Sequence, residues 1–256
     1  MSKSKTNIKK IKDVYDKSIV TKKLLFDMPF RIGLTGRSGS GKTNILVNLL
    51  DDDFYGKDFE SENIYIISGS LSSDNKIKDL VKRKDIPLEN LYNGYKEDEV
   101  TELYNMLQDN YNIAMYNKEK AEHVCVIFDD VSFDNSLKNK SGGVIDRFAC
   151  NSRKFLVNII FTSQKYTQFS TCIRENLTGI ICASCSDRVL DLISDDFNML
   201  GDRKLFRKIY RSITDDKFQF FVTNLSNDKQ NRYLTHNFEP VCVCEKGNKK
   251  CKNKMI

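Results

Sequence analysis

The chain has 256 residues, of which 40% are hydrophobic and 30% are charged, with three prolines and no tryptophan. This composition is typical of a globular protein, and no apolar run approaches the roughly 18 residues that a membrane-spanning helix needs. The charged N-terminus does not resemble a secretory signal, and eight cysteines without such a signal favour free thiols in a reducing compartment. We therefore expect a protein that is not secreted and acts inside a cell or in a particle assembled there.

The distribution of apolar residues predicts strands that alternate with helices. We expect strands at residues 30–35, 63–68, 124–128, 155–161 and 179–183, then a hairpin at 218–222 and 232–234. We expect helices after residue 41, within 72–96, at 97–120, around 144–149, and at 188–200 and 203–212. The 97–120 helix is expected to bury Val100, Leu103, Met106, Leu107 and Tyr111. This order predicts an α/β fold with a mainly parallel central sheet and helices on both faces.

Positive charge is concentrated at the two ends of the sequence. Eight lysines against two aspartates give residues 1–23 a charge of +6, and five lysines against one glutamate give residues 245–254 a charge of +4. Basic arms on a mildly acidic body suit a nucleic-acid partner, although lysine-rich ends also serve solubility alone. We divide the chain into a basic extension (1–23), one domain (24–240) and a basic, cysteine-containing tail (241–256).

Eight consecutive residues match the phosphate-binding loop pattern G-x-x-x-x-G-K-[ST], between an expected strand and an expected helix. They are Gly36, Arg37, Ser38, Gly39, Ser40, Gly41, Lys42 and Thr43. The glycines let successive N–H groups face phosphate oxygens, and the start of the helix adds partial positive charge. The loop predicts binding of a nucleoside triphosphate, with Lys42 reaching the β- and γ-phosphates and the Thr43 hydroxyl ligating Mg²⁺.

An acidic pair follows the apolar run at 124–128, which is the Walker B arrangement of ATPases. Asp129 is predicted to hold Mg²⁺ directly or through water, and Asp130 to orient and polarise the water that attacks the γ-phosphate. Many ATPases have the longer glutamate at the second position, so an aspartate there requires a tighter geometry.

A glutamine follows the strand expected at 155–161. Ligands of parallel sheets bind outside the carboxyl ends of the strands, so Gln164 is predicted to hydrogen-bond the γ-phosphate or the attacking water. A polar cap on the strand is the alternative interpretation.

An arginine from a neighbouring subunit often meets the charge that develops in phosphoryl transfer. Arg153 is our first candidate for this role because it lies at the junction of a helix and the Gln164 strand. Arg174 and then Arg147 are the further candidates, and a solvated surface arginine is the alternative for each.

Three segments together resemble the FtsK–HerA superfamily of ring-forming DNA motors, and within it the poxvirus-type packaging ATPases of large DNA viruses and virophages. They are the phosphate-binding loop, the strand that ends in Asp129 and Asp130, and residues 158–164 with Ile173-Arg174-Glu175-Asn176 after them. The resemblance covers residues 30–200. It implies a P-loop NTPase fold of the RecA or FtsK–HerA type that uses ATP and Mg²⁺, with Gln164 as the sensor of the γ-phosphate.

The resemblance also implies a function and partners. The protein would be an ATPase that forms a homo-oligomeric, hexameric ring and threads double-stranded DNA into a preformed capsid, with capsid proteins as partners and no membrane. It would act in the host cytoplasm at viral assembly sites and associate with the virion. Lys138 and Lys140, in the basic segment after Asp130, are candidates for contacts with DNA phosphate, and a solvated loop is the alternative.

The cysteines allow two further hypotheses. Cys182 and Cys185 have the spacing of a redox or zinc motif, but Cys182 falls in an expected strand, so we interpret it as a core residue. The C-terminal set of His236, Cys242, Cys244 and Cys251 offers four potential zinc ligands, although C-x-C departs from the usual spacing.

Other functions remain open from the sequence. A nucleotide kinase lacks support because no arginine-rich lid segment is evident, and a GTPase lacks it because no [NT]-K-x-D guanine signature occurs. A nucleotide-gated assembly scaffold with little hydrolysis stays open as an alternative because Asp130 is an aspartate where many ATPases have a glutamate.

Overall fold

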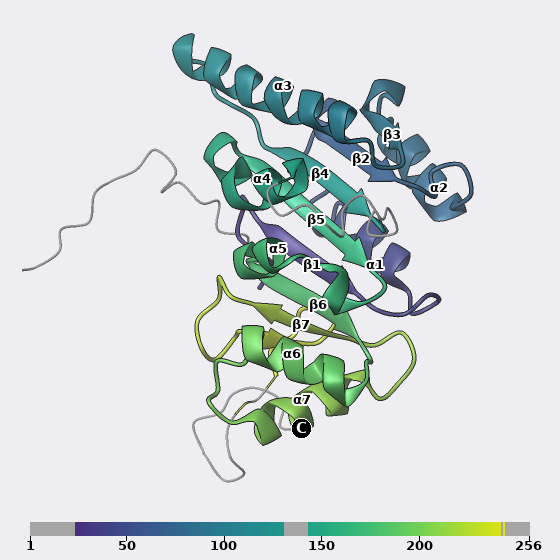
Figure 1. Ribbon diagram of the computed structural model, residues 1–256, viewed down its shortest axis with the longest axis vertical. Helices are drawn as coiled ribbons and strands as arrows, with labels where there is room; N and C mark the ends of the chain where they lie inside the picture. The colour runs from purple at the N-terminus through teal and green to yellow at the C-terminus, as the bar shows by residue number, and fades with distance from the viewer. Residues whose placement is uncertain (1–23, 131–142, 242, 244–256) are drawn as a thin grey trace, which may run out of the picture.

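An eight-stranded sheet forms the centre of the protein in a computed structural model that describes residues 24–130, 143–241 and 243 (Figure 1). The strands lie side by side in the order β3-β2-β4-β5-β1-β6-β7-β8. Their bounds are β1 Arg31–Thr35, β2 Ile64–Ser68, β3 Leu91–Asn93, β4 Val124–Asp129, β5 Val157–Ser163, β6 Gly179–Ala183, β7 Phe220–Asn224 and β8 Tyr233–Leu234.

The pairing of the strands confirms the mainly parallel sheet. The six strands from β3 to β6 in that order pair in parallel, whereas β7 pairs antiparallel with β6 and with β8. The predicted hairpin is therefore also confirmed. β4, β5 and β6 consist mostly of apolar residues because both of their faces are covered.

Helices cover both faces of the sheet, and two apolar cores result (Figure 1). Buried residues of α3 to α7 form one core with one face of the sheet, and those of α1 and α2 form the other. The helices are α1 Lys42–Leu49, α2 Asn75–Lys84, α3 Glu97–Tyr116, α4 Val144–Asn151, α5 Thr171–Asn176, α6 Asp187–Phe197 and α7 Arg203–Thr214. Single 3₁₀ turns are η2 Ser61–Asn63, η3 Leu88–Asn90, η6 Ser152–Phe155 and η7 Tyr166–Gln168.

The prediction for residues 72–120 was wrong in two details. The short strand β3 was missed, because three partly exposed residues give no apolar run. On α3, Met106 is 39% exposed and Tyr104 is buried in its place. The ring of Tyr104 packs edge-on against those of Phe148 and Phe155, so contacts with α4 and η6 decide which side of α3 is buried.

The topology brings three separate segments to one edge of the sheet. The phosphate-binding loop follows β1, Asp129 and Asp130 end β4, and Gln164 follows β5. β5 lies between β1 and β4, so Gln164 stands between the loop and the acidic pair. The rings of Phe128 and Phe161 stack across β4 and β5 with centroids 5.3 Å apart, one residue before the polar ends of both strands.

Candidate functional site at the carboxyl edge of the sheet

The phosphate-binding loop turns tightly from β1 into α1. Gly41 has a φ of 100°, a conformation that favours glycine, and a Cβ on Gly36 would lie 2.6 Å from Ser40 Oγ. Lys42 folds back over the loop and its Nζ donates to the carbonyls of Gly36 at 2.7 Å and Arg37 at 3.3 Å. No described side chain caps the first turn of α1, so its amides are available to an anion.

Asp129 is held rigidly at the end of β4. Its side chain is buried, and each carboxylate oxygen accepts a hydrogen bond from a neighbouring strand. Ser68 Oγ at the end of β2 donates to Oδ2 at 2.8 Å, and Thr162 Oγ1 on β5 donates to Oδ1 at 2.7 Å. These two hydroxyls fix the orientation of the carboxylate and were not assigned a role in the sequence. A serine or threonine at the end of a strand next to Walker B is the signal that could have identified them.

Asp130 is placed differently from its neighbour. Its φ is 50°, and its backbone N–H donates to Thr162 Oγ1 at 2.9 Å. Its Oδ2 accepts from Gln164 Nε2 at 2.9 Å, whereas Oδ1 is buried without a hydrogen-bond partner among the described residues. One oxygen of this carboxylate is therefore free to accept a hydrogen bond from a bound molecule.

The charges at this edge influence one another. Burial raises the pKa of Asp130 above its ordinary value and nearby Asp129 adds to the rise, while the Gln164 hydrogen bond and Lys42 oppose it. Burial lowers the pKa of Lys42, and Asp130 and Asp129 oppose that change. The lysine and both carboxylates thus lie within electrostatic reach of one another.

A shared cavity and one hydrogen bond connect further loop residues and Asp74 with the site of Lys42, Asp129, Asp130 and Gln164. Gln164 and the loop residues Gly36, Arg37 and Ser38 line one cavity of about 220 Å³. Thr43 Oγ1 lies 3.3 Å from Oδ2 of Asp74, whose Oδ1 caps the start of α2. Asp74 was missed in the sequence, where it reads as an ordinary helix cap.

Neither of the two arginines predicted to act in catalysis lines the cavity that Gln164 shares with the loop. Arg153 is in η6, before the amino end of β5, and the seven residues of β5 at about 3.3 Å each separate it from Gln164 by roughly 20 Å. Arg174 on α5 pairs with Asp196 at 3.3 Å and lies over the ring of Tyr166. Arg147, exposed on α4, lies over the ring of Tyr104. Within one subunit the structure does not bring these arginines to the phosphate-binding loop.

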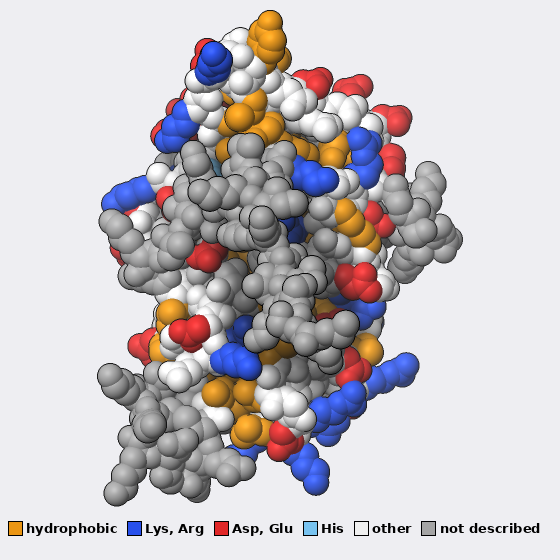
Figure 2. All heavy atoms as spheres, turned by 90° about the vertical axis from the view of Figure 1, so that its left-hand side faces the viewer, with side chains coloured by type: hydrophobic (Ala, Val, Ile, Leu, Met, Phe, Trp, Pro, Cys, Tyr) orange, Lys and Arg blue, Asp and Glu red, His pale blue; other side chains and the backbone are white. Residues whose placement is uncertain are grey.

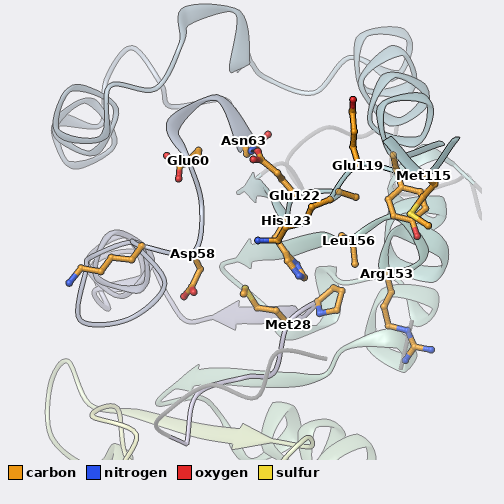
Figure 3. Close-up of a pocket in the computed structure, with 15 residues that line it drawn as sticks. Met28, Asp58, Glu60, Asn63, Met115, Glu119, Glu122, His123, Arg153 and Leu156 are labelled. Carbon is orange, nitrogen blue, oxygen red and sulfur yellow. The ribbon is translucent and has the colours of Figure 1, made fainter. Parts of the chain in front are cut away.

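A larger cavity of about 640 Å³ opens at the opposite, amino edge of the sheet (Figure 3). Its lining includes Met28, Asn63, His123 and Leu156, which precede β1, β2, β4 and β5, and Arg153 lies at its edge. The described side chains on this side of the molecule include both positive and negative charges, and several Lys and Arg side chains gather at the lower right of the view (Figure 2).

Several predictions fall on residues that the structure does not describe. Lys138, Lys140, the basic extension at 1–23, and Cys242, Cys244 and Cys251 all lie outside the described residues. Within the described ranges, no group of three or more His, Cys, Asp and Glu residues has the arrangement of a metal site.

Cys182 is fully buried in β6, as its interpretation as a core residue requires. No helix in the described part is long and apolar enough to cross a membrane.

Comparisons with known proteins identify a family for the chain and solved structures with a similar fold. The model of the poxvirus A32 protein family matches residues 17–234. No curated protein matches the chain. Among solved structures, the DNA-packaging ATPase B204 of Sulfolobus turreted icosahedral virus is similar at 13% identity and a TM-score of 0.55, over 82% of this chain and 97% of that one. B204 of Sulfolobus turreted icosahedral virus 2, in complex with AMP, is similar at 16% identity and a TM-score of 0.53, over 77% and 93%. The cytoplasmic domain of the Thermomonospora curvata type VII secretion ATPase EccC is similar at 12% identity and a TM-score of 0.50, over 77% and 24%.

Proposed function

Because the chain belongs to the poxvirus A32 protein family, we propose that it is an ATP-hydrolysing motor that packages a double-stranded viral DNA genome into a preformed capsid. The observation that carries the proposal is the group formed by Lys42, Asp130 and Gln164, with one oxygen of Asp130 buried and without a hydrogen-bond partner among the described residues. The similar fold of the DNA-packaging ATPase B204 of Sulfolobus turreted icosahedral virus supports it. So does that of the genome packaging NTPase B204 of Sulfolobus turreted icosahedral virus 2, which was solved in complex with AMPPCP and with ATP-gammaS.

Each residue of the group has a role in hydrolysis. The amides of the loop and of the first turn of α1 bind the phosphates, and Lys42 moves from the Gly36 carbonyl to the β- and γ-phosphates. The free oxygen of Asp130 accepts a proton from the attacking water, and its raised pKa makes it a stronger base than an ordinary aspartate. Gln164 bridges this base and the γ-phosphate, so it changes partner when the phosphate leaves.

The residues present also suit Mg²⁺, which binds through oxygen atoms of one or two carboxylates together with substrate phosphates. Thr43 and Asp129 would hold it, and Asp74 lies beside Thr43 as a further oxygen donor. The ion would neutralise charge on the β- and γ-phosphate oxygens. The absence of a three-carboxylate cluster among described residues agrees with an ion that relies on the nucleotide for the rest of its ligands.

Coupling to DNA requires parts supplied by other subunits. We propose a homo-oligomeric, hexameric ring around the DNA, with Lys138 and Lys140 in contact with its phosphates. Arg153 is separated by the length of β5 from the site of its own subunit, so it can serve only a neighbouring one. For Arg174, the same role would require release of Asp196. Capsid proteins would be the further partners, at assembly sites in the host cytoplasm and in the virion.

The proposal is tested by steady-state ATP hydrolysis with and without long double-stranded DNA. We expect DNA to stimulate turnover of the full chain, with the stimulation falling as salt rises because phosphate contacts release counterions. The Lys42→Ala variant provides the background rate. Binding of ATP with slow turnover that ignores DNA would contradict the motor and favour a nucleotide-gated scaffold.

A second experiment tests the arginine that acts between subunits. Arg153→Ala and Lys42→Ala variants are each expected to be inactive alone, and mixing them should restore part of the activity at interfaces where an intact Arg153 meets an intact Lys42. The same mixture with Arg174→Ala compares the two candidates. Failure of both mixtures to regain activity would rule out both arginines as residues that act in trans.

A further inference from the structure

Phe218 is an exposed aromatic residue in an unfavourable backbone conformation beside the phosphate-binding loop. Phe218 lies between α7 and β7, is 63% exposed, and has a φ of 64°. Positive φ is unusual for a bulky residue, and such positions concentrate at ligand-binding sites. The ring is close to the loop, since its Cδ1 would lie 3.3 Å from a Cβ built on Gly41.

The sheet order places Phe218 on a particular side of the loop. Asp130 and Gln164 follow β4 and β5, on one side of β1, whereas β6 and β7 lie on the other side. Phe220, at the start of β7, pairs with Ala183 at the carboxyl end of β6, so Phe218, two residues earlier, stands at the same edge of the sheet as the loop. Figure 1 shows that β7 begins at this edge. A triphosphate with its γ-phosphate toward Asp130 therefore extends its nucleoside toward the β6–β7 side.

We propose that the ring of Phe218 stacks on the base of the bound nucleoside triphosphate, an inference that rests on the proposed function. Gly41 has no side chain, which lets the ring lie against the phosphate-binding loop. A planar ring stacks on the π-face that every base has, so the contact adds affinity with little discrimination among bases. Phe218 is thus a binding residue for the nucleoside, separate from the residues that hold the phosphates.

The test compares a ligand with a base and one without. The dissociation constants of ATP and inorganic tripolyphosphate are measured on the full chain for wild type, Phe218→Ala and Phe218→Tyr. We expect Phe218→Ala to weaken ATP binding by about 5- to 150-fold, the loss of one base–aromatic stack, and to leave tripolyphosphate binding unchanged. Phe218→Tyr keeps the ring and should bind ATP like the wild type. Tyr116→Ala, at an 88% exposed aromatic residue on α3, is the matched control.

The other outcomes separate the two proposals. Equal loss of ATP and tripolyphosphate binding in Phe218→Ala would mean that the substitution disturbs the loop, and would overturn the stacking role. Unchanged ATP binding in Phe218→Ala would also overturn it, and would locate the base elsewhere, such as the cavity lined by Ser184 and Val189. Failure of the wild type to bind either ligand would overturn the proposed function itself.

Discussion

Asn158 at the amino edge of the sheet and Asp130 at the carboxyl edge are buried polar side chains that are held in opposite ways. At the amino edge, Asn158 on β5 accepts from the backbone N–H of Phe30 at 3.0 Å and donates to the carbonyl of Val124 at 3.1 Å. At the carboxyl edge, Asp130 has one paired oxygen and one buried oxygen without a partner among the described residues. A buried polar group with all its bonds made stabilises the fold, whereas one with a bond left unmade is costly and points to a ligand. The comparison separates one polar residue with a structural role, Asn158, from one with a proposed functional role, Asp130.

Lysine substitutions at the two edges test the comparison with a large expected effect on ATP turnover. Lys42→Ala should lower ATP turnover by about 10²- to 10³-fold, because it removes a charged donor from the transferring phosphate. Lys57→Ala, in the cavity at the amino edge, should leave turnover unchanged. Steady-state hydrolysis by the two variants is the measurement, and equal losses in both would contradict the assignment of the site to one edge.

In contrast to Lys42→Ala, which should lower ATP turnover, Asn158→Ala should lower the stability of the fold. It leaves the Phe30 N–H and the Val124 carbonyl without the side-chain partner, which should lower the free energy of unfolding by about 2–3 kcal/mol. Denaturant unfolding measures this loss. ATP affinity at temperatures where the variant is folded should match the wild type, and a selective loss of ATP affinity would show that the amino edge is part of the site.

Two serine substitutions, Ser68→Ala and the control Ser61→Ala, test whether the hydrogen bond from Ser68 holds Asp129 in place. Ser68→Ala removes the hydroxyl that donates to Asp129 Oδ2 and should raise the Mg²⁺ concentration for half-maximal activity by about 10-fold. Ser61→Ala removes an exposed hydroxyl near the amino end of β2 and should change nothing. If the Mg²⁺ dependence of Ser68→Ala equals that of the wild type, Asp129 does not depend on this contact.

The smallest of the expected effects is on the pH dependence of the unfolding free energy, which should distinguish Asp130 from an ordinary aspartate. Its folded-state pKa is raised, so the wild type loses stability as pH rises from the unfolded value near 3.8 through the folded value. Asp130→Asn has no such group. Its unfolding free energy should match the wild type at low pH and exceed it at neutral pH. A variant that is less stable than the wild type at neutral pH would contradict the unpaired, desolvated carboxylate.

Much of the site could be predicted because local patterns encode it. The eight loop residues fit a pattern whose geometry depends on glycines and a following helix, and Asp129, Asp130 and Gln164 each follow an apolar strand. The parallel sheet then brings the three strand ends together, as predicted. The hydroxyls of Ser68 and Thr162 were missed because their role depends on which strands are neighbours in the sheet. The order of the strands cannot be predicted from the sequence of any one segment.

Long-range contacts explain the other differences. The sequence places Arg153 before the Gln164 strand, and the direction of β5 puts it at the opposite edge from Gln164, so its role between subunits stays a prediction. Phe218 was read as the start of a strand, since an aromatic residue before an apolar run is typical of one. Its exposure and positive φ become visible only when β7 pairs with β6 beside the loop.

The most direct test of the site is the rate at which the chain hydrolyses pre-bound ATP in a single turnover, for wild type and Asp130→Asn. If the unpaired carboxylate oxygen activates water, the variant should bind ATP at least as tightly as the wild type and hydrolyse it about 10²- to 10⁴-fold more slowly. Asp58→Asn, an aspartate of the amino-edge cavity whose pKa burial also raises, should hydrolyse ATP at the wild-type rate. Hydrolysis by Asp130→Asn at the wild-type rate would contradict the role of Asp130 as the base.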